Sequence, residues 1–319
     1  MMASAVAGVA PALSPLRGRD YLSSADFSAA ETASLLDLAA QLKRGDRRID
    51  LGNRALGLIF TKASTRTRVS FNVAMARLGG QTVDLNPTLT QLGRGEPVQD
   101  TARVLSRYCD VLAIRTFAQQ ELVEYAHWAS VPVINALTDL EHPCQALADF
   151  LTMREVHGDL EGQTLAYIGD GNNVAHSLML CGALLGVNVR IACPEGFEPL
   201  PGVLDQARSL ALNGASIDVL TDPVQAVAGA QAVYTDVWAS MGQEQEQADR
   251  EQAFSGFCVT QELMDQAASN AIVLHCLPAH RGEEISNAVM EGPASRIFDQ
   301  AENRLHAQQA LLAAVMGGL

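Results

Sequence analysis

Hydroxyl and guanidinium side chains gather in one short stretch of the chain, residues 64–68, which reads Ser-Thr-Arg-Thr-Arg. The apolar run at 55–60 predicts a buried strand, and the amphipathic pattern at 69–80, closed by two glycines, predicts a helix. A helix start offers unpaired backbone N–H groups and the positive end of the helix dipole, which favour an oxyanion. The hydroxyl groups add donors, and Arg66 adds a planar fork that can hold phosphate with two hydrogen bonds. The stretch therefore predicts a phosphate site; the alternative is an ordinary capped helix with two surface arginines.

Further polar residues lie where predicted strands end or predicted helices begin. These residues are Arg115, His142, Gln145, Asn173, Asp236, Ser240 and Cys276. Open α/β sheets bind ligands at the carboxyl edge of their strands, so one cleft could collect these side chains. His142 can donate to a carbonyl oxygen, Gln145 can accept from an amide, and the carboxylate of Asp236 can hold an ammonium group. Because we expect these side chains to meet in one cleft, we predict a functional site there.

Each of these groups also has a purely structural interpretation. His142 and Gln145 could form a polar cap at the start of a helix between two domains. Asp236 could cap a loop or a helix. Cys276 could be a nucleophile or simply a small buried residue, which is the commoner role of a cysteine.

The turn at residues 169–173, Gly-Asp-Gly-Asn-Asn, partly matches a dinucleotide-binding fingerprint. The third glycine of that fingerprint would fall at Val174, however, and no acidic residue closes the next strand near Arg190. The pattern therefore disfavours nicotinamide binding, and the turn could instead present Asn173 to a polar substrate.

The elements that would position these groups alternate between strand and helix. Besides the first strand and helix, strands are predicted at 81–85, 110–116, 131–136, 164–169, 188–193, 232–236 and 271–276, and helices at 20–44, 97–108, 121–129, 142–156, 174–185, 203–213 and 302–316. Such alternation predicts an α/β fold with doubly covered parallel sheets. A second series of strands and helices begins near Gly162, so we expect two doubly wound parallel-sheet domains linked by bridging helices.

We expect three parts along the chain. Residues 1–16 are Ala-rich and uncharged and predict a disordered tail, with a cleaved targeting segment as the alternative. Residues 17–141, completed by the C-terminal helix at 302–319, would form a first domain. Residues 142–301, including the bridging helix, would form the second.

Composition limits the classes of function. The chain has 319 residues, of which 48% are hydrophobic, and a net charge of −14, so it can bury a large core but has no overall basic field for nucleic acid. No apolar run approaches membrane-spanning length. The six cysteines form no C-x-x-C pair, which indicates reduced thiols in a cytoplasmic protein.

Five motifs in the same order make the chain resemble the aspartate/ornithine carbamoyltransferase family, in particular its ornithine branch. They are Ser-Thr-Arg-Thr-Arg at 64–68, His-Pro-x-Gln at 142–145, Gly-Asp-Gly-Asn-Asn at 169–173, Asp-x-Trp-x-Ser-Met-Gly at 236–242 and His-Cys-Leu-Pro at 275–278. The resemblance extends from about Asp20 to the C-terminus. The last two motifs favour ornithine over aspartate as the acceptor.

The resemblance implies roles for individual residues. Carbamoyl phosphate would be bound by Ser64, Thr65, Arg66, Thr67, Gln91, Arg115, His142, Pro143, Cys144, Gln145, Cys276, Leu277 and Arg304. Ornithine would be bound by Asn173, Asp236, Ser240 and Met241. The residues that carry the chemistry would be Arg66, Arg115, His142 and Cys276.

The resemblance also implies a reaction and an assembly. The δ-amine of L-ornithine would attack the carbamoyl carbon and release phosphate and L-citrulline, a step of arginine biosynthesis. No metal or organic cofactor would take part. The family builds homotrimers, and its C-terminal helix packs back on the first domain while the two domains close on the second substrate.

Three other functions compete with this one. The acceptor could be N-acetylornithine or putrescine, although Asp236 and the Ser-Met-Gly loop favour an amine with a free α-amino group. The chain could hold carbamoyl phosphate or ornithine without turnover, but Arg66, Arg115 and Cys276 are all present. A nicotinamide oxidoreductase is disfavoured by Val174.

Overall fold

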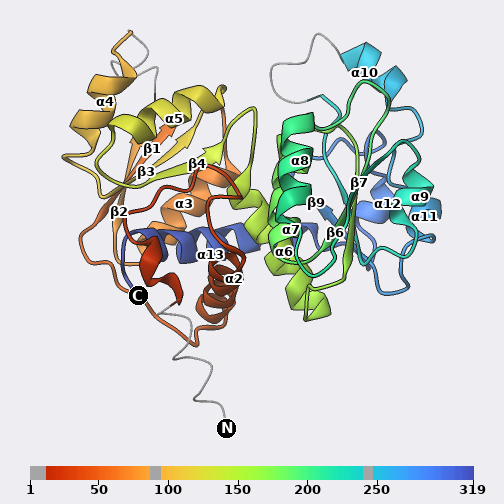
Figure 1. Ribbon diagram of the computed structural model, residues 1–319, viewed down its shortest axis with the longest axis horizontal. Coiled ribbons are helices and arrows are strands. Elements are labelled where there is room, and N and C mark those ends of the chain that lie inside the picture. The colour runs from red at the N-terminus through yellow and green to blue at the C-terminus, as the bar shows by residue number, and fades with distance from the viewer. Residues whose placement is uncertain (1–11, 87–94, 240–246) are drawn as a thin grey trace. The chain divides into compact units, whose positions relative to one another are not determined.

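The computed structural model describes residues 12–86, 95–239 and 247–319 (Figure 1). The chain divides into two compact units, Met1–Ala148 with Asn303–Leu319, and Asp149–Glu302. We describe each unit separately. The boundary expected between residues 141 and 142 precedes a helix, whereas the contacts divide the chain inside that helix, after Ala148.

The first unit contains a parallel four-stranded sheet in the order β2-β1-β3-β4. Its strands are β1 (Ala55–Phe60), β2 (Gln81–Leu85), β3 (Val111–Arg115) and β4 (Val133–Leu137). All five residues of β3 are buried, as expected for a central strand covered on both faces. From β1 the chain first adds β2 on one side and then β3 and β4 on the other, so the strand order reverses between β1 and β3. Open α/β sheets bind ligands at this switch point.

Helices cover both faces of this sheet. They are α2 (Ala29–Arg44), α3 (Arg66–Arg77), α4 (Val98–Leu105), α5 (Gln119–Trp128) and the C-terminal α13 (Ile297–Val315), which belongs to this unit from Asn303 on. The helices α4 and α5 lie on one face, and α2, α3 and α13 lie on the other (Figure 1). The expected return of the C-terminal helix to the first domain is confirmed, since Lys43 Nζ on α2 donates to Asn303 Oδ1 on α13 at 2.8 Å.

Two predictions near the N-terminus need correction. The helix predicted at 20–44 begins only at Ala29, where Ser28 and Glu31 form a capping box. Before it, Tyr21 forms an isolated parallel bridge with Ile134 of β4. Residues 1–11 of the expected tail lie outside the described part, but Ser14–Leu16 forms a 3-10 helix, η1, with Leu16 fully buried. Residues 14–16 therefore belong to the folded unit.

The second unit contains a parallel five-stranded sheet in the order β7-β6-β5-β8-β9. Its strands are β5 (Thr164–Ile168), β6 (Asn188–Ala192), β7 (Ile217–Leu220), β8 (Ala232–Thr235) and β9 (Ile272–His275). The sequence analysis missed β7, because only Ile217 of its four residues is buried and the apolar signal is weak. The direction change lies between β5 and β8.

The helices of the second unit are α7 (Asn173–Leu184), α8 (Pro201–Leu210), α9 (Pro223–Val227), α10 (Gln247–Ala253), α11 (Gln261–Met264) and α12 (Asn287–Met290). Figure 1 shows α7 and α8 on one face of the sheet and α9, α11 and α12 on the other. The last four helices were not predicted, since elements of four to seven residues are too short to show a helical period. The remaining helix, α6 (Pro143–His157), begins in the first unit and ends in the second.

None of the helices in the described part of the chain combines the length and the apolar character needed to cross a lipid bilayer.

Candidate functional site

The carboxyl edge of the first sheet brings the Ser-Thr-Arg-Thr-Arg motif at 64–68 next to Arg115. Phe60, the last residue of β1, is in register with Arg115, the last residue of β3. The backbone N–H of Thr61 donates to the Arg115 carbonyl oxygen at 2.9 Å. The loop after β1 therefore starts beside the backbone of Arg115, and α3 follows it at Arg66.

Five buried side chains meet at this edge. Arg304 Nη1 donates to Gln145 Oε1 at 2.8 Å and lies 3.3 Å from His142 Nε2, and Arg304 Nη2 donates to Thr67 Oγ1 at 2.8 Å. Arg115 Nη1 reaches the same hydroxyl oxygen of Thr67 at 3.5 Å. Each of the five is at most 7% exposed. The structure thus brings together two guanidinium groups, a histidine, an amide and a hydroxyl, which we call the arginine cluster.

The arginine cluster keeps His142 neutral. Burial lowers the pKa of His142 well below 6.5, and the positive charges of Arg304, Arg115 and Arg66 lower it further. Because an arginine only donates, the contact with Arg304 requires His142 Nε2 to accept. The proton of the neutral ring is therefore on Nδ1.

The other predicted phosphate residues surround the start of α3. Ser64 is half-buried, and Thr65 and Arg66 are exposed. Thr65 is the N-cap residue of α3, and its side chain makes no capping hydrogen bond among the described residues. A helix start of this kind keeps N–H groups available for an anion. Gln91 lies outside the described residues.

Pro143 and Cys144 have structural surroundings. Pro143 is the first residue of α6, a position that suits proline because no backbone N–H is needed there. Cys144 is fully buried, and its thiol donates to the carbonyl oxygen of Asn135 at 3.4 Å. Burial raises the pKa of Cys144 to about 12, so this thiol is not a nucleophile at neutral pH.

Lys62 is a nearby cation that the sequence analysis did not single out. Its ammonium group lies 3.9 Å from the centroid of the Phe117 ring. Burial, followed by the charge of Arg115, lowers the pKa of Lys62. Its position two residues before Ser64 is the feature of the sequence that could have identified Lys62 as part of this site.

The carboxyl edge of the second sheet carries Asp236, directly after β8. Asp236 Oδ1 accepts from the Cys276 thiol at 2.9 Å and from the Val237 N–H at 2.8 Å. Asp236 Oδ2 accepts from Asn172 Nδ2 at 3.1 Å. Cys276 follows β9, the neighbour of β8, which explains why the two strand ends meet. We call Asp236, Cys276 and Asn172 the carboxylate cluster.

The sequence analysis chose Asn173 from the glycine-rich turn, whereas the contact with Asp236 comes from Asn172. Asn172 is the N-cap of α7, and its Oδ1 accepts from the N–H groups of Val174 and Ala175. Asn173 is half-buried and is the first residue of α7. Ser240 and Met241, the other predicted ornithine ligands, lie outside the described residues.

Arg250 on α10 is a second residue that the sequence analysis missed. Its Nη1 donates to Asp170 Oδ2 and to the Trp238 carbonyl oxygen, both at 2.7 Å. The guanidinium also lies 5.1 Å from the centroid of the Phe197 ring. Arg250 thereby fixes the turn after β5 to the loop after β8, the two segments that carry Asn172 and Asp236.

Two groups in the described part of the second unit have the residue types of a metal site. Asp236, His275 and Cys276 form one, and His280, Glu283 and Glu284 form the other, with ligand atoms within 4.8 Å of one another in each. Cys276 already donates to Asp236, and both ring nitrogens of His275 are hydrogen-bonded. We therefore interpret the polar atoms of the first group as members of hydrogen bonds within the protein.

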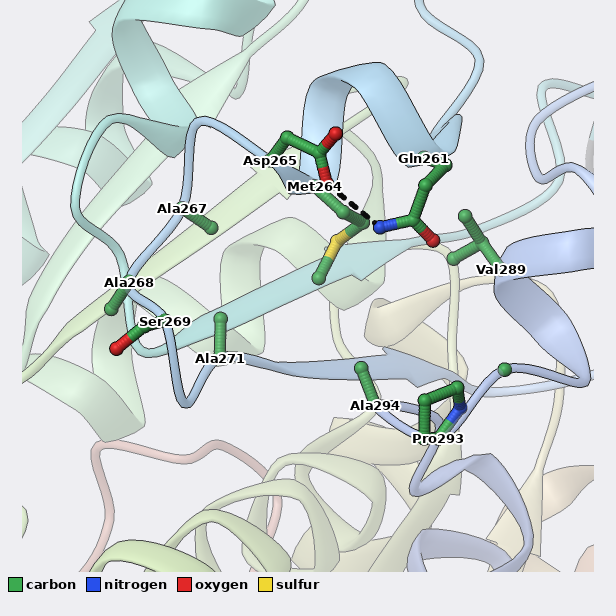
Figure 2. A pocket seen from close by; sticks show the side chains of 11 residues that line it. Gln261, Met264, Asp265, Ala267, Ala268, Ser269, Ala271, Val289, Pro293 and Ala294 are labelled. Atoms are coloured by element: carbon green, nitrogen blue, oxygen red, sulfur yellow. Dashed lines mark hydrogen bonds between the residues drawn. The ribbon is translucent and has the colours of Figure 1, made fainter.

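A pocket of about 430 Å³ lies at the opposite end of β9 (Figure 2). Its lining includes Ala271, directly before β9, and Gln261, whose Nε2 donates to Asp265 Oδ1 at 2.9 Å. Because Cys276 follows the carboxyl end of the same strand, this pocket is separate from the carboxylate cluster. We assign it no part in the chemistry.

Family models match almost the whole chain. The model described as "Aspartate/ornithine carbamoyltransferase, carbamoyl-P binding domain" matches residues 19–155. The model described as "Aspartate/ornithine carbamoyltransferase, Asp/Orn binding domain" matches residues 161–315. The arginine cluster falls within the first match except for Arg304, and the carboxylate cluster within the second.

Individual relatives agree with these models. The chain is 84% identical over 318 residues to an ornithine carbamoyltransferase of Parasynechococcus marenigrum, with 100% of both chains covered. A crystal structure of ornithine carbamoyltransferase from Gloeobacter violaceus is 57% identical, with a TM-score of 0.87, over 94% of this chain and 100% of that one. The enzyme from Pyrococcus furiosus gives 50% identity and a TM-score of 0.91 over 95% and 99%. The chain therefore belongs to the aspartate/ornithine carbamoyltransferase family.

Proposed function

We propose that this chain transfers the carbamoyl group of carbamoyl phosphate to the δ-amine of L-ornithine, giving L-citrulline and phosphate. Its membership of the family and the ornithine carbamoyltransferase names of its relatives support the reaction. The rest of the argument is chemical and uses the two clusters in turn.

The arginine cluster is the observation that carries the proposal. Two buried guanidinium groups approach the hydroxyl of Thr67, and the start of α3 adds backbone N–H groups and the helix dipole. Burial lowers the pKa of His142, and the positive charges that collect here lower it further. Such surroundings favour a dianion, so we assign carbamoyl phosphate to Ser64, Thr65, Arg66, Thr67, Gln91, Arg115, His142, Pro143, Cys144, Gln145 and Arg304, joined by Cys276 and Leu277.

The carboxylate cluster supports an amino-acid acceptor. A carboxylate at the end of β8 can hold the α-ammonium group of ornithine through a charge-assisted hydrogen bond. The thiol of Cys276 and the amide of Asn172 fix the two oxygens of Asp236 in place. We assign ornithine to Asn173, Asp236, Ser240 and Met241, and add Asn172 as the residue that orients Asp236.

The reaction needs electrostatic stabilisation and a neutral amine. The nitrogen lone pair of the δ-amine attacks the carbamoyl carbon to form a C–N bond, and a tetrahedral centre with a negative oxygen results. When the C–O bond breaks, its electron pair leaves with phosphate, and the positively charged nitrogen gives up its proton to the departing phosphate. Arg66 and Arg115 would stabilise the oxyanion and the departing phosphate. Neutral His142 would donate from Nδ1 to the carbamoyl oxygen.

A free alkylamine is largely protonated at neutral pH, so the site must also lower the pKa of the δ-amine. Burial beside guanidinium groups acts in that direction. Asp236, which holds the α-ammonium group, and Cys276 would orient ornithine for the attack without forming a covalent intermediate.

The surroundings of the enzyme complete the proposal. The reaction would serve arginine biosynthesis in the cytoplasm, in a homotrimer or a multiple of trimers, with no cofactor, nucleic acid or membrane involved. All six cysteines are free thiols, which fits a reducing compartment. The domain limits that we propose are 17–141 with 302–319 for carbamoyl phosphate and 142–301 for ornithine.

The test is citrulline formation from carbamoyl phosphate, with ornithine, N-acetylornithine, putrescine and aspartate compared side by side. Turnover confined to ornithine supports the proposal. Turnover with another amine would keep the phosphate site and overturn the assignment of the acceptor. A folded protein that binds carbamoyl phosphate and converts none of the four amines would instead be a binding protein.

A further inference from the structure

Leu277 has an unusual backbone conformation directly after Cys276. Its φ is +60°, and among the described residues only Asn213 is another non-glycine residue with positive φ. A leucine in this region places its Cβ close to the following carbonyl oxygen, so the conformation must be stabilised by its surroundings. The question is which residues hold it.

His275 holds Leu277 through its ring. The backbone N–H of Leu277 donates to His275 Nδ1 at 2.8 Å. His275 Nε2 lies 3.0 Å from Glu284 Oε1, and both side chains are fully buried. Because Nδ1 accepts, the ring proton must be on Nε2, where it is donated to Glu284.

Glu284 and His275 are themselves fixed from other elements. Glu284 Oε1 also accepts from the His280 N–H at 2.6 Å, and the Glu284 carbonyl oxygen accepts from the Val259 N–H at 2.8 Å. The backbone N–H of His275 donates to Gln300 Oε1 at 2.8 Å. A chain of directed hydrogen bonds therefore runs from Glu284 through the His275 ring to the backbone of Leu277.

We infer that Glu284 and His275 are positioning residues for the transfer reaction, an inference that rests on the function proposed above. Cys276 lies between His275 and Leu277, and its thiol must point at Asp236 Oδ1, 2.9 Å away. Holding both neighbours of Cys276 fixes the direction of that thiol and the path of the backbone at Leu277. Neither Glu284 nor His275 is among the residues that we assign to the substrates; each acts through Leu277.

Two substitutions of His275 separate positioning from simple packing. In His275→Asn the amide oxygen replaces Nδ1 as the acceptor for Leu277, so kcat should stay within about tenfold of wild type because the hydrogen bond to Leu277 is kept. In His275→Gln the side chain can still reach Glu284 but offers Leu277 no acceptor at the right distance. The shift of Cys276 and Leu277 should lower kcat about a hundredfold, as a misplacement of about 1 Å can.

Glu284 offers a second matched pair. Glu284→Gln keeps an acceptor for His275 Nε2–H and should keep kcat near wild type, whereas Glu284→Leu removes the acceptor and should resemble His275→Gln. Binding of inorganic phosphate, followed by calorimetry, should be unchanged in all four variants. The Ser-Thr-Arg-Thr-Arg motif at 64–68, which we expect to bind the phosphate group itself, lies in the other unit of the chain.

A measurement on the wild-type protein is independent of turnover and of the stability of the variants. In ¹⁵N-histidine NMR spectra, His275 should show an unprotonated Nδ1 and a protonated Nε2. This pattern should persist in Glu284→Gln and be lost in Glu284→Leu. His275→Asn identifies the signal by its disappearance.

The outcomes separate this inference from the proposed function. A protonated Nδ1 in wild type, equal losses of kcat in His275→Asn and His275→Gln, or full activity of His275→Gln would each overturn the positioning role and leave the reaction intact. A wild-type protein that converts no amine would overturn the proposed reaction, whatever the NMR spectrum shows.

Discussion

Arg304 donates a hydrogen bond of 2.8 Å to the hydroxyl of Thr67, across a separation of 237 positions in the sequence. Thr67 lies in the first turn of α3, and Arg304 lies on the C-terminal helix α13. The same guanidinium also contacts Gln145 and His142. The last helix of the chain therefore completes the arginine cluster of the first unit.

Arg304→Lys should weaken carbamoyl phosphate binding about tenfold to a hundredfold. A lysine ammonium has no planar fork, so it cannot satisfy Thr67 and Gln145 together, and each lost charged hydrogen bond costs about 1.5–3 kcal/mol. The dissociation constant from calorimetry measures the effect. Arg44→Lys, at an arginine whose side chain is 60% exposed, is the matched control and should bind like wild type. Equal binding by both variants would contradict a role for Arg304.

The lowered pKa of His142 predicts an acid-sensitive fold. An unfolded histidine takes up a proton near pH 6.5, whereas folded His142 does so only at lower pH. Between these values the unfolded state binds more protons, so the free energy of unfolding should decrease as the pH falls below about 6.5. Urea unfolding of the first unit at pH 7.5, 6.5 and 5.5, values chosen to bracket the ordinary histidine pKa, measures the slope.

His142→Asn should reduce that slope because the titrating group is removed. His127→Asn, at an exposed histidine, is the control and should keep the wild-type slope. A slope that is unchanged in His142→Asn would mean that other groups cause the acid sensitivity.

Arg250→Ala should destabilise the second unit by about 3 kcal/mol, because it leaves the largely buried carboxylate of Asp170 without its ion pair. The matched control is Arg44→Ala, which breaks an exposed ion pair with Asp46 and should cost at most about 1 kcal/mol. Thermal and urea unfolding provide both values. If the two substitutions cost the same, Arg250 does not hold the turn as described.

Gly171→Ala should destabilise the second unit by about 2 kcal/mol, because overpacking forces the backbone to move. An added Cβ would lie 2.2 Å from the backbone nitrogen of Pro199 and 2.5 Å from the carbonyl carbon of Glu198. Gly202→Ala on α8 meets no atom within 4 Å and should be neutral or stabilising by up to about 1 kcal/mol. Differential scanning calorimetry of both variants tests the contrast, and a neutral Gly171→Ala would refute it.

Cys276→Ser should retain most of the activity, and Cys276→Ala should lose about tenfold in kcat. The serine hydroxyl can still donate to Asp236, whereas alanine leaves that oxygen without the thiol donor. Rapid-quench mass spectrometry during turnover should find no carbamoyl group on Cys276. A carbamoylated Cys276 peptide would establish a covalent intermediate and overturn its role as an orienting group.

Local patterns in the sequence were sufficient for the architecture. Strands and helices leave periodic apolar signals over a few residues, and those signals gave the alternation, the parallel sheets and the position of the phosphate motif after β1. The short elements β7 and α9 to α12 were lost because they contain too few residues to show a period.

The sequence by itself determined which residues stand at strand ends and helix starts, and through its motifs it pointed to the family and to Arg304. Only the tertiary structure decided which of them meet. The hydrogen bond from Asn172, rather than Asn173, to Asp236 depends on the direction of two side chains in one turn. The positioning of Leu277 by His275 and Glu284 depends on a loop that returns to the end of β9. The periodicity of apolar residues is a local property of the chain. Hydrogen-bond partners instead depend on the path of the whole chain, and no spacing in the sequence specifies that path.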